Sequence, residues 1–493
     1  MGERESVGES KDGSESVAVS GNAVDGEGTA VGEKTAIGES AAVGERTAIG
    51  EKVAIREKFS LSVGLAGQNA LYGFIGAYFM FFLTDILGIG MAVAGVILTI
   101  ATIFDAINDP IMGLIAYRTR TRWGKFRPYL IFGPTLLAAA TVLCFTKFDL
   151  SATGLIAMGL IAYVCFDLTY TLCDIPIWGL TSVIHREPKI RTNVITWANF
   201  GATFGSVFIT VLGIQIINLF GGEREPNAFF FTALIIGVVT AVFMISTGFF
   251  TRERVISEEK PKPVKQNFQT LYKNKPLLIL ILSIFCVILT INIRGTIQMY
   301  YAVYVVEDTN FMTYAGLALV IGIVIGLSIT PKLIGKFFKK HIFIAACAFN
   351  VVMSLIPFFI GYQHMWVNVG LLGVGFISTG MFNSLIPTLL MDCIDYAEWK
   401  LGFRGEGIVF STRTFISKLC ASIARGATGI SLGLLGFVVN VKQAPSVVNG
   451  LHALMFLVPA ILIALAIIPM IFFPFTEDKR EAMMAEMAER GKA

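Results

Sequence analysis

Charged residues are scarce in this chain, and their scarcity excludes a soluble globular protein. Only 15% of the 493 residues are Asp, Glu, Lys or Arg, whereas an ordinary soluble domain has about 25%. The mean hydropathy is +0.70. From residue 59 onward, apolar runs reach the ~20 residues that a helix needs to cross a bilayer. The composition therefore predicts a protein that crosses a lipid bilayer many times.

Cysteine is also too scarce and too scattered to stabilise a small fold through several disulfide bonds. All seven cysteines lie inside apolar segments, without Cys-X-X-Cys or Cys/His spacing, which excludes a disulfide scaffold. No basic, aromatic-rich segment lies outside the apolar runs, so we expect no nucleic-acid partner. Neither a nucleophile–base pair nor a metal-ligand set is evident, so we predict that the protein is not an enzyme and uses no cofactor.

The first 58 residues differ from the rest of the chain. They are rich in Gly, Ser, Ala, Val and Glu, they carry a net charge of −5, and they lack the apolar core of a signal peptide. A hexapeptide repeat runs from TAVGEK (29–34) to VAIREK (53–58), and its six-residue aliphatic period is typical of β-helix rungs. Two interpretations stay open, a low-complexity tail or a small β-helical head that assembles with another chain. The oligomeric state is not predicted.

The apolar segments predict an all-α membrane protein of twelve transmembrane helices. A polar, proline-bearing stretch over 252–275 divides them six and six, as in two bundles joined by a cytoplasmic linker. We therefore expect a tail over 1–58, bundles over 59–251 and 276–476, and a second tail over 477–493. The twelve predicted segments are 61–87, 91–116, 128–147, 152–183, 192–220, 228–251, 276–305, 312–333, 341–361, 365–394, 405–440 and 450–475.

Lysine and arginine are distributed unevenly among the predicted loops. The loops on the side of the two termini carry 21 Lys and Arg residues, and the opposite loops carry only Lys147, Arg224 and Lys442. Because cytoplasmic loops are enriched in positive charge, we predict that both termini are cytoplasmic and that the protein lies in the plasma membrane.

Polar side chains within the predicted spans are costly and are therefore candidate functional residues. Asp105, Asn108 and Asp109 in FDAINDP have i, i+3 and i+4 spacing, so they share one helical face. Together with Thr171 of the segment 152–183, they form an oxygen-rich set that suits Na⁺, Li⁺ or a proton. The alternative for Asp109 is that it caps a break before Pro110.

Two further sets of polar residues lie in the predicted spans. The segment 152–183 contains Asp174, with Asp167 two turns earlier on the same face and Trp178 one turn later, where it could stack on a sugar ring or simply pack. The segment 405–440 contains Arg413 and a stripe at 3, 4 and 7 spacing, and the segment 276–305 contains Arg294. The stripe consists of Ser411, Thr414, Lys418 and Arg425, of which Arg425 could instead snorkel to the membrane interface.

The membrane body resembles the glycoside–pentoside–hexuronide:cation symporters, the melibiose-permease-like family of the major facilitator superfamily. The resemblance covers about residues 59–480. The motifs that carry it are FLTDILG (82–88), DAINDPIMG (105–113), TRTRWGKFRP (119–128), TYTLCDIPIW (169–178), DYAEWK (395–400), RGEG (404–407) and FPFTEDK (473–479).

The resemblance implies a substrate site between two six-helix halves near the membrane midplane. It assigns Asp105, Asn108, Asp109 and Thr171 to the cation, with Asp105 and Asp109 as metal ligands if the ion is Na⁺. It assigns Asp174, Trp178, Thr414 and Lys418 to the sugar. Other sugar positions of the family are replaced here by amides, namely Gln68, Asn69, Asn199 and Asn383.

We therefore predict a secondary active transporter that couples a sugar or glycoside to Na⁺ or H⁺. There are two alternatives: a carrier of the same fold for a lipid-like substrate, and a membrane sensor or scaffold that does not transport. The substrate is a neutral or an acidic sugar. Arg294 and Arg413 favour the acid, because a substrate carboxylate satisfies a buried arginine well. The competing interpretation is that the two arginines pair with protein acids or line the water-filled path.

Overall fold

The computed structural model describes residues 53–185, 187–254, 272–401 and 406–474, together with Met483 and Glu486. The hexapeptide repeat up to residue 52 and most of the predicted linker and C-terminal tail lie outside the described residues. The described residues belong to one unit that begins at Val53.

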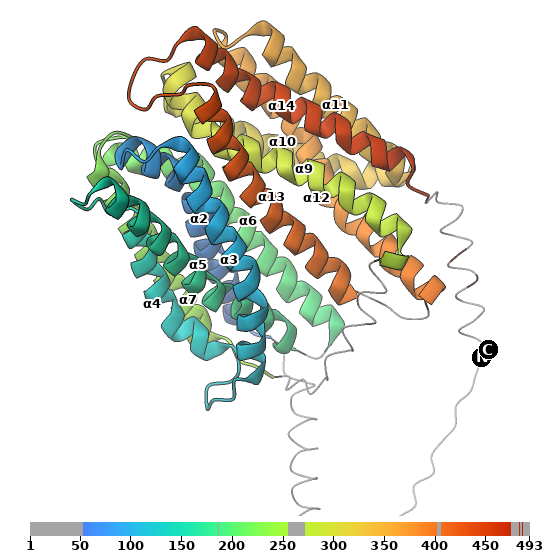
Figure 1. The fold of residues 1–493 in the computed structure, drawn as a ribbon. Helices are drawn as coiled ribbons and strands as arrows, with labels where there is room; N and C mark the ends of the chain where they lie inside the picture. Colours follow the sequence, from blue (N-terminus) through green and yellow to red (C-terminus); the bar gives the residue numbers. More distant parts are fainter. Residues whose placement is uncertain are drawn as a thin grey trace, which may run out of the picture. The chain divides into compact units, whose positions relative to one another are not determined.

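In the described part of the chain, six long helices form the N-terminal half, as the apolar runs predict (Figure 1). The first continues directly into a π-helical turn, η1 (Phe82–Ile86). Three of the six begin with proline in their first turn, where its missing N–H costs no hydrogen bond. The helices are α2 (Ile55–Phe81), α3 (Met91–Arg118), α4 (Arg127–Cys144), α5 (Ala152–Val183), α6 (Pro188–Leu219) and α7 (Pro226–Phe250).

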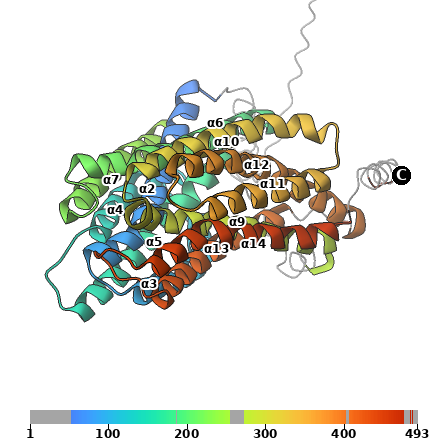
Figure 2. The same ribbon diagram turned by 90° about the horizontal axis from the view of Figure 1, so that it is seen from above.

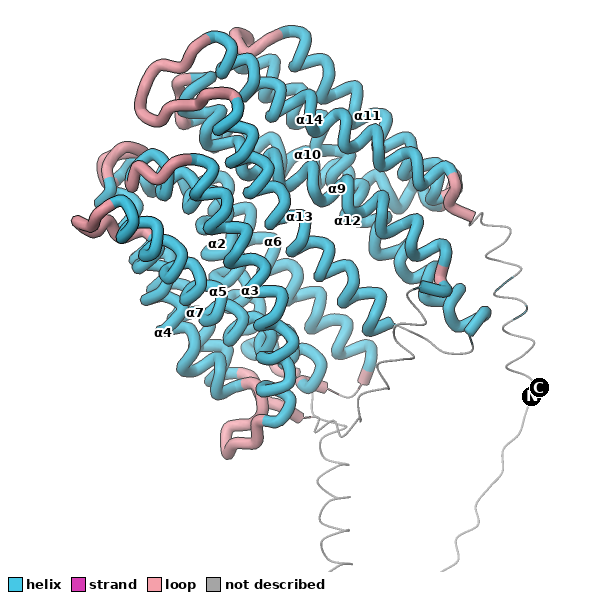
Figure 3. Tube along the Cα trace, viewed as in Figure 1, coloured by secondary structure: helices cyan, strands magenta, loops and turns pink. Residues whose placement is uncertain are grey.

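Six more helices of the described residues form the C-terminal half, and the first of them also runs into a π-helical turn, η2 (Ala302–Val306). The same irregularity at the end of the first helix of each half is consistent with two related halves. Figure 3 shows helices joined by short loops, without a strand among the described residues. The helices are α9 (Lys275–Tyr301), α10 (Asn310–Ile334), α11 (Lys339–Ile360), α12 (Met365–Leu401), α13 (Glu406–Leu434) and α14 (Pro445–Ile471).

The prediction of an all-α membrane protein is confirmed. Within the described residues, eleven of these helices are long and apolar enough to cross a membrane. The twelfth, α13, carries Arg413, Lys418 and Arg425 along its length and is the least apolar of the long helices. The charged side chains of α13 are therefore candidates for functional residues within the membrane-spanning body.

Within the described residues, the two halves meet most extensively where α3 packs on α13, α6 on α10 and α2 on α9. Figure 2 shows α3 and α13 side by side. Their contact is close because Gly95 of α3 faces Gly426 and Gly429 of α13, and a Cβ on Gly95 would already touch both. Small residues at such crossings let helix backbones approach each other in a membrane.

Helix α2 begins at Ile55, six residues before the predicted segment. The first turn is held by Glu57, which accepts hydrogen bonds from the Arg254 guanidinium at 2.9 and 3.0 Å. Both side chains are buried, so the start of α2 is fixed to the chain that follows α7. Apolarity alone could not reveal this polar first turn.

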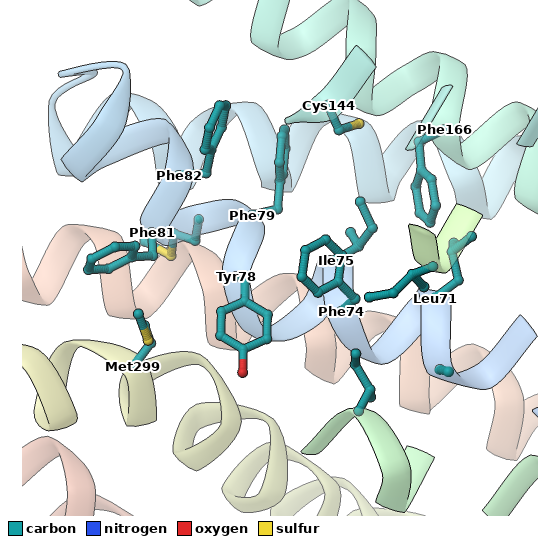
Figure 4. Packing of buried hydrophobic residues seen from close by; sticks show 14 of the residues in the cluster. Leu71, Phe74, Ile75, Tyr78, Phe79, Phe81, Phe82, Cys144, Phe166 and Met299 are labelled. Atoms are coloured by element: carbon teal, nitrogen blue, oxygen red, sulfur yellow. The ribbon is translucent and has the colours of Figure 1, made fainter. Parts of the chain in front are cut away.

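An aromatic cluster fills the core of the N-terminal half (Figure 4). Phe79 stacks on Tyr163 at 5.1 Å between ring centroids, and Phe82 packs on Phe145 at 5.3 Å. In Figure 4 the ring of Tyr78 points in a different direction from Phe79. Tyr78 is fully buried, and its hydroxyl finds no hydrogen-bond partner among the described residues.

Candidate functional site

Two carboxylates of α3 and one hydroxyl of α5 meet inside the helical body. The Thr171 hydroxyl lies 3.1 Å from Asp105 Oδ1 and 3.2 Å from Asp109 Oδ1. A threonine has one proton to donate, so Thr171 can satisfy only one carboxylate at a time. Asp105 and Thr171 are buried and Asp109 is half-buried. The packing of α5 on α3 thus brings together three of the four predicted cation ligands.

The fourth predicted ligand, Asn108, lies on the same helix but makes no hydrogen bond to either carboxylate. Its amide Nδ2 is buried and has no partner among the described residues. Because an N–H group donates hydrogen bonds and cannot coordinate a cation, this unpartnered atom does not by itself place Asn108 among the ion ligands.

Lys418 of α13 reaches this pair of carboxylates from the other half of the chain. Its Nζ lies 2.9 Å from Asp105 Oδ2 and also bonds to Asp109 Oδ2. The ammonium therefore sits between the two carboxylates and neutralises part of their charge. A cation that binds both carboxylates must share or replace this contact.

A cavity of about 160 Å³ adjoins the carboxylate pair. It is lined by Asp174, which accepts a hydrogen bond from Gln68 Nε2 at 2.5 Å. The Gln68 side chain is fully buried and its Oε1 has no partner among the described residues. Asp167 also lines the cavity and has a buried, unpartnered Oδ2. Unsatisfied polar atoms around a small cavity fit a hydroxyl-rich ligand.

Arg425 is a site residue whose role the sequence left open. Rather than snorkelling, its side chain is buried, and its Nη1 donates to the Tyr163 hydroxyl at 2.6 Å. Arg425 and Tyr72 line both the small cavity and a larger one of about 290 Å³. The two cavities are therefore neighbours, with Arg425 and Tyr72 on the boundary between them.

The larger cavity draws residues from both halves of the chain, including Tyr78 of α2 and Arg294 of α9. Arg294 is 6% exposed, and its Nη2 donates to Ser354 Oγ at 2.5 Å. Tyr78 and Arg294 each keep a buried polar atom without a partner among the described residues. The sequence predicted Arg294 as a substrate residue, and the structure places it in this cavity.

Of three further predicted substrate residues, Thr414 lines a cavity, whereas Trp178 and Arg413 do not. Thr414 lines the smaller cavity, and Trp178 packs, half-buried, against the hydrophobic core. Arg413 is half-buried and lines neither cavity.

Three amide positions that the resemblance assigned to the sugar are not brought to the cavity walls. Asn69 donates to the carbonyl of Leu65 in its own helix at 3.0 Å, and Asn199 and Asn383 are exposed on α6 and α12. Of the four amides, only Gln68 bonds to another site residue.

A further contact between the halves was missed by sequence reasoning. Asp85 in η1 accepts hydrogen bonds from Thr84 at 2.6 Å and from the Tyr304 hydroxyl in η2. Asn440, which follows α13, donates its backbone N–H to the Tyr304 hydroxyl at 2.9 Å and its Nδ2 to the Asp85 carbonyl at 2.8 Å. Thr84 also bonds to the Tyr300 hydroxyl. The sequence feature that could have indicated this contact is the acidic residue Asp85 inside the apolar motif FLTDILG.

Comparison with known proteins agrees with this architecture. A family model described as MFS/sugar transport protein matches residues 60–477. The isoprimeverose transporter of Lactiplantibacillus pentosus is 30% identical over 448 residues, which cover 88% of this chain and 91% of that protein. The glucuronide carrier protein homolog of Escherichia coli (strain K12) is 26% identical and covers 87% of this chain and 95% of that protein.

Among solved structures, the inward open conformation of the xylose transporter from E. coli aligns with a TM-score of 0.60. The match covers 87% of this chain and 99% of the xylose transporter, with 14% sequence identity. At that identity, the likeness concerns the fold.

Proposed function

Because the chain belongs to the MFS/sugar transport protein family, we propose that it is a secondary active transporter that moves a sugar or glycoside together with Na⁺ or H⁺. Relatives named for isoprimeverose and for glucuronide support a sugar as the substrate. The uphill step needs no cofactor beyond the coupling ion, because the ion gradient supplies the energy.

The observation that carries this proposal is the meeting of Asp105, Asp109 and Thr171 with Lys418. Carboxylate and hydroxyl oxygens are the ligands that hard cations prefer, and a pair of close carboxylates can also share one proton. Without the ion, the Lys418 ammonium bonds to both carboxylates and neutralises part of their charge. When the ion binds, it weakens the Lys418 contact, so that ion binding acts directly on the junction of α3 with α13.

The sugar is proposed to bind in the two neighbouring cavities, next to the ion. Asp174 and Gln68 would bind sugar hydroxyls, and Lys418 would respond to both ligands because it lines the small cavity as well. Sharing one side chain between two ligands is a simple physical basis for coupling, since each ligand then changes the affinity for the other.

We place the protein in the plasma membrane with both termini in the cytoplasm, because positively charged loops lie on that side. With this orientation, the Asp85–Tyr304 contact lies at the extracytoplasmic end. The ribbons of the two halves come together at that end and diverge toward the other end (Figure 1). The described conformation therefore corresponds to a carrier closed to the outside.

Uptake of labelled sugars into proteoliposomes tests the proposal. Purified protein is reconstituted and given an inward Na⁺ gradient, an inward proton gradient, or no gradient. We expect accumulation above equilibrium for at least one sugar with one of the two gradients. Accumulation that is the same with and without each gradient, for a sugar that does exchange, would show a uniporter instead.

A further inference from the structure

Arg294 is a buried charge, and no acidic side chain in the described part of the chain pairs with it. It lies in the middle of α9 and is 6% exposed. Among the described residues, its hydrogen-bond acceptor is the neutral Ser354 hydroxyl, and its buried Nε has no partner. A charged side chain within a membrane span costs several kcal/mol unless it is paired or hydrated, so a structural role alone does not account for this arginine.

The cavity around Arg294 is lined by polar and apolar residues, and no acidic side chain among the described residues lines it. The cavity of about 290 Å³ is lined by Thr290, Asn292, Thr296 and Gln298 but by no Asp or Glu side chain. Its volume is near the lower end of the range for small-molecule sites. The cavity thus offers hydrogen-bond groups for hydroxyls around one uncompensated positive charge.

A chain of buried hydrogen bonds fixes the Arg294 guanidinium in this cavity. Ser354 Oγ, which accepts from Arg294, donates to the Asn350 carbonyl at 2.7 Å. The Asn350 Nδ2 in turn donates to Ser378 Oγ at 2.6 Å. The chain links α9, α11 and α12, and all its members are buried. A guanidinium held in this way is preorganised for a planar or tetrahedral anion.

The neighbouring arginine differs from Arg294 in its electrostatic surroundings. Arg425 also lines the smaller cavity, where Asp105, Asp167 and Asp174 supply negative charge. Three acids, including the predicted cation ligand Asp105, therefore line one cavity, and Arg294 lines the other. This separation keeps an anionic group away from the carboxylates that would repel it.

We propose that Arg294, positioned by Ser354 and Asn350, binds an anionic group, a carboxylate or a sulfonate, on the transported sugar. The inference rests on the proposed sugar transport and names the substrate class of that site. The sugar hydroxyls face the polar walls of the larger cavity, and the anion makes charge-assisted hydrogen bonds with the guanidinium. Arg294 is thus a specificity residue, and Ser354 and Asn350 are positioning residues.

Ligand binding to the purified protein, without any gradient, tests the inference. Affinities are measured by calorimetry for matched probes: D-glucuronate against D-glucose, D-galacturonate against D-galactose, methyl β-D-glucuronide against methyl β-D-glucoside, and 6-deoxy-6-sulfo-D-glucose against D-glucose. We expect at least one acid to bind about tenfold or more tightly than its neutral counterpart. Arg294→Gln should remove about tenfold to a hundredfold of the acid's affinity, because hydrogen bonds to charged groups contribute this much.

Matched variants separate recognition from folding. Arg191→Gln removes the same charge from an exposed residue that lines neither cavity, and should leave the ratio of acid to neutral affinity unchanged. Ser354→Ala should lower that ratio while the neutral affinity stays within about twofold, and Arg294→Lys should retain part of it. A retained neutral affinity in each variant demonstrates that the site is folded.

Three results would overturn the inference: no acid binds more tightly than its neutral partner, Arg294→Gln weakens both members of a pair equally, or inorganic sulfate alone competes as well as the acidic sugar. None of them depends on coupling. A failure here is therefore distinct from a failure of gradient-driven uptake.

Discussion

Lys418 of α13 lies 2.9 Å from Asp105 of α3, across the boundary between the two halves of the chain. The two residues are 313 positions apart, and their contact is adjacent to the Thr171 hydroxyl that bonds to the same carboxylate. One ion pair therefore connects the proposed cation site to the helix pair that joins the halves.

Replacement of Lys418 by glutamine should strengthen cation binding and weaken coupling. The ammonium competes with the cation for the two carboxylates, and opposite charges this close interact by more than 1 kcal/mol even near a protein surface. We expect the cation concentration for half-maximal sugar binding to fall by about tenfold, measured by titration of sugar binding with Na⁺ or H⁺. Lys418→Arg retains the charge and serves as the control. An unchanged cation requirement in Lys418→Gln would contradict the competition.

Loss of the Tyr304 hydroxyl should loosen the contact at the ends of α2 and α9. Tyr304→Phe removes one donor from the buried Asp85 carboxylate and one acceptor from the Asn440 N–H. Unsatisfied buried polar groups cost about 1–3 kcal/mol. We therefore expect hydrogen exchange of Phe82–Ile86 and Ala302–Val306 to accelerate about tenfold.

Tyr362→Phe provides the matched control for this prediction. Tyr362 packs against His452 in the C-terminal half, away from the contact of Asp85 with Tyr304. If both tyrosine variants exchange like the wild type, the Asp85–Tyr304 contact does not hold the halves together.

The loop before α4 supplies a stability prediction. Glu253 accepts three backbone N–H groups, from Lys125, Phe126 and Arg127, at 2.8, 2.7 and 3.1 Å. Glu253→Ala leaves these donors at the start of α4 without their acceptor and should cost about 1–2 kcal/mol. A lower apparent melting temperature in detergent is the expected readout, with Glu223→Ala as the control.

A substitution at Gly124 provides a second test of the contact between Glu253 and the loop before α4. Its φ of 111° suits glycine, and a Cβ there would lie 2.6 Å from a Glu253 carboxylate oxygen. Gly124→Ala should destabilise the protein in both backgrounds, but less when Glu253 is already alanine. Strict additivity of the two changes would show that they do not interact.

The N-terminal tail should be dispensable for transport. The described helical unit begins at Val53, which is buried, and Glu57 fixes the start of α2 to Arg254. Deletion of residues 1–52 should leave insertion and sugar uptake within about twofold of the full chain. A deletion variant that inserts normally but does not transport would assign the hexapeptide repeat a role in assembly or gating.

Features of the fold that depend on residues close together in the chain could be predicted from local sequence patterns. Apolar runs located the helices, because span length is set by the bilayer, and the spacing of Asp105 and Asp109 placed them on one face. The polar first turn of α2 escaped that criterion because its stabilising partner, Arg254, is almost 200 residues away.

Partners far apart in the chain could not be derived from spacing. The resemblance nominated Lys418 and Asp174, but neither the ion pair with Asp105 nor the Gln68 bond follows from a local pattern. The role of Arg425 was ambiguous for the same reason, since its burial depends on Tyr163 of another helix. Tertiary packing decides which polar residues of a helix reach the interior.

The central claim is that the carboxylates of α3 carry the coupling cation, and gradient-driven uptake by Asp105→Cys tests it most directly. Proteoliposomes with this variant, the wild type and the exposed-loop control Asp149→Cys are loaded with the same sugar and given the same Na⁺ or proton gradient. The account predicts that Asp105→Cys still exchanges sugar down its own gradient but neither accumulates it nor responds to the cation, whereas Asp149→Cys behaves like the wild type. Accumulation by Asp105→Cys at the wild-type level would contradict the account.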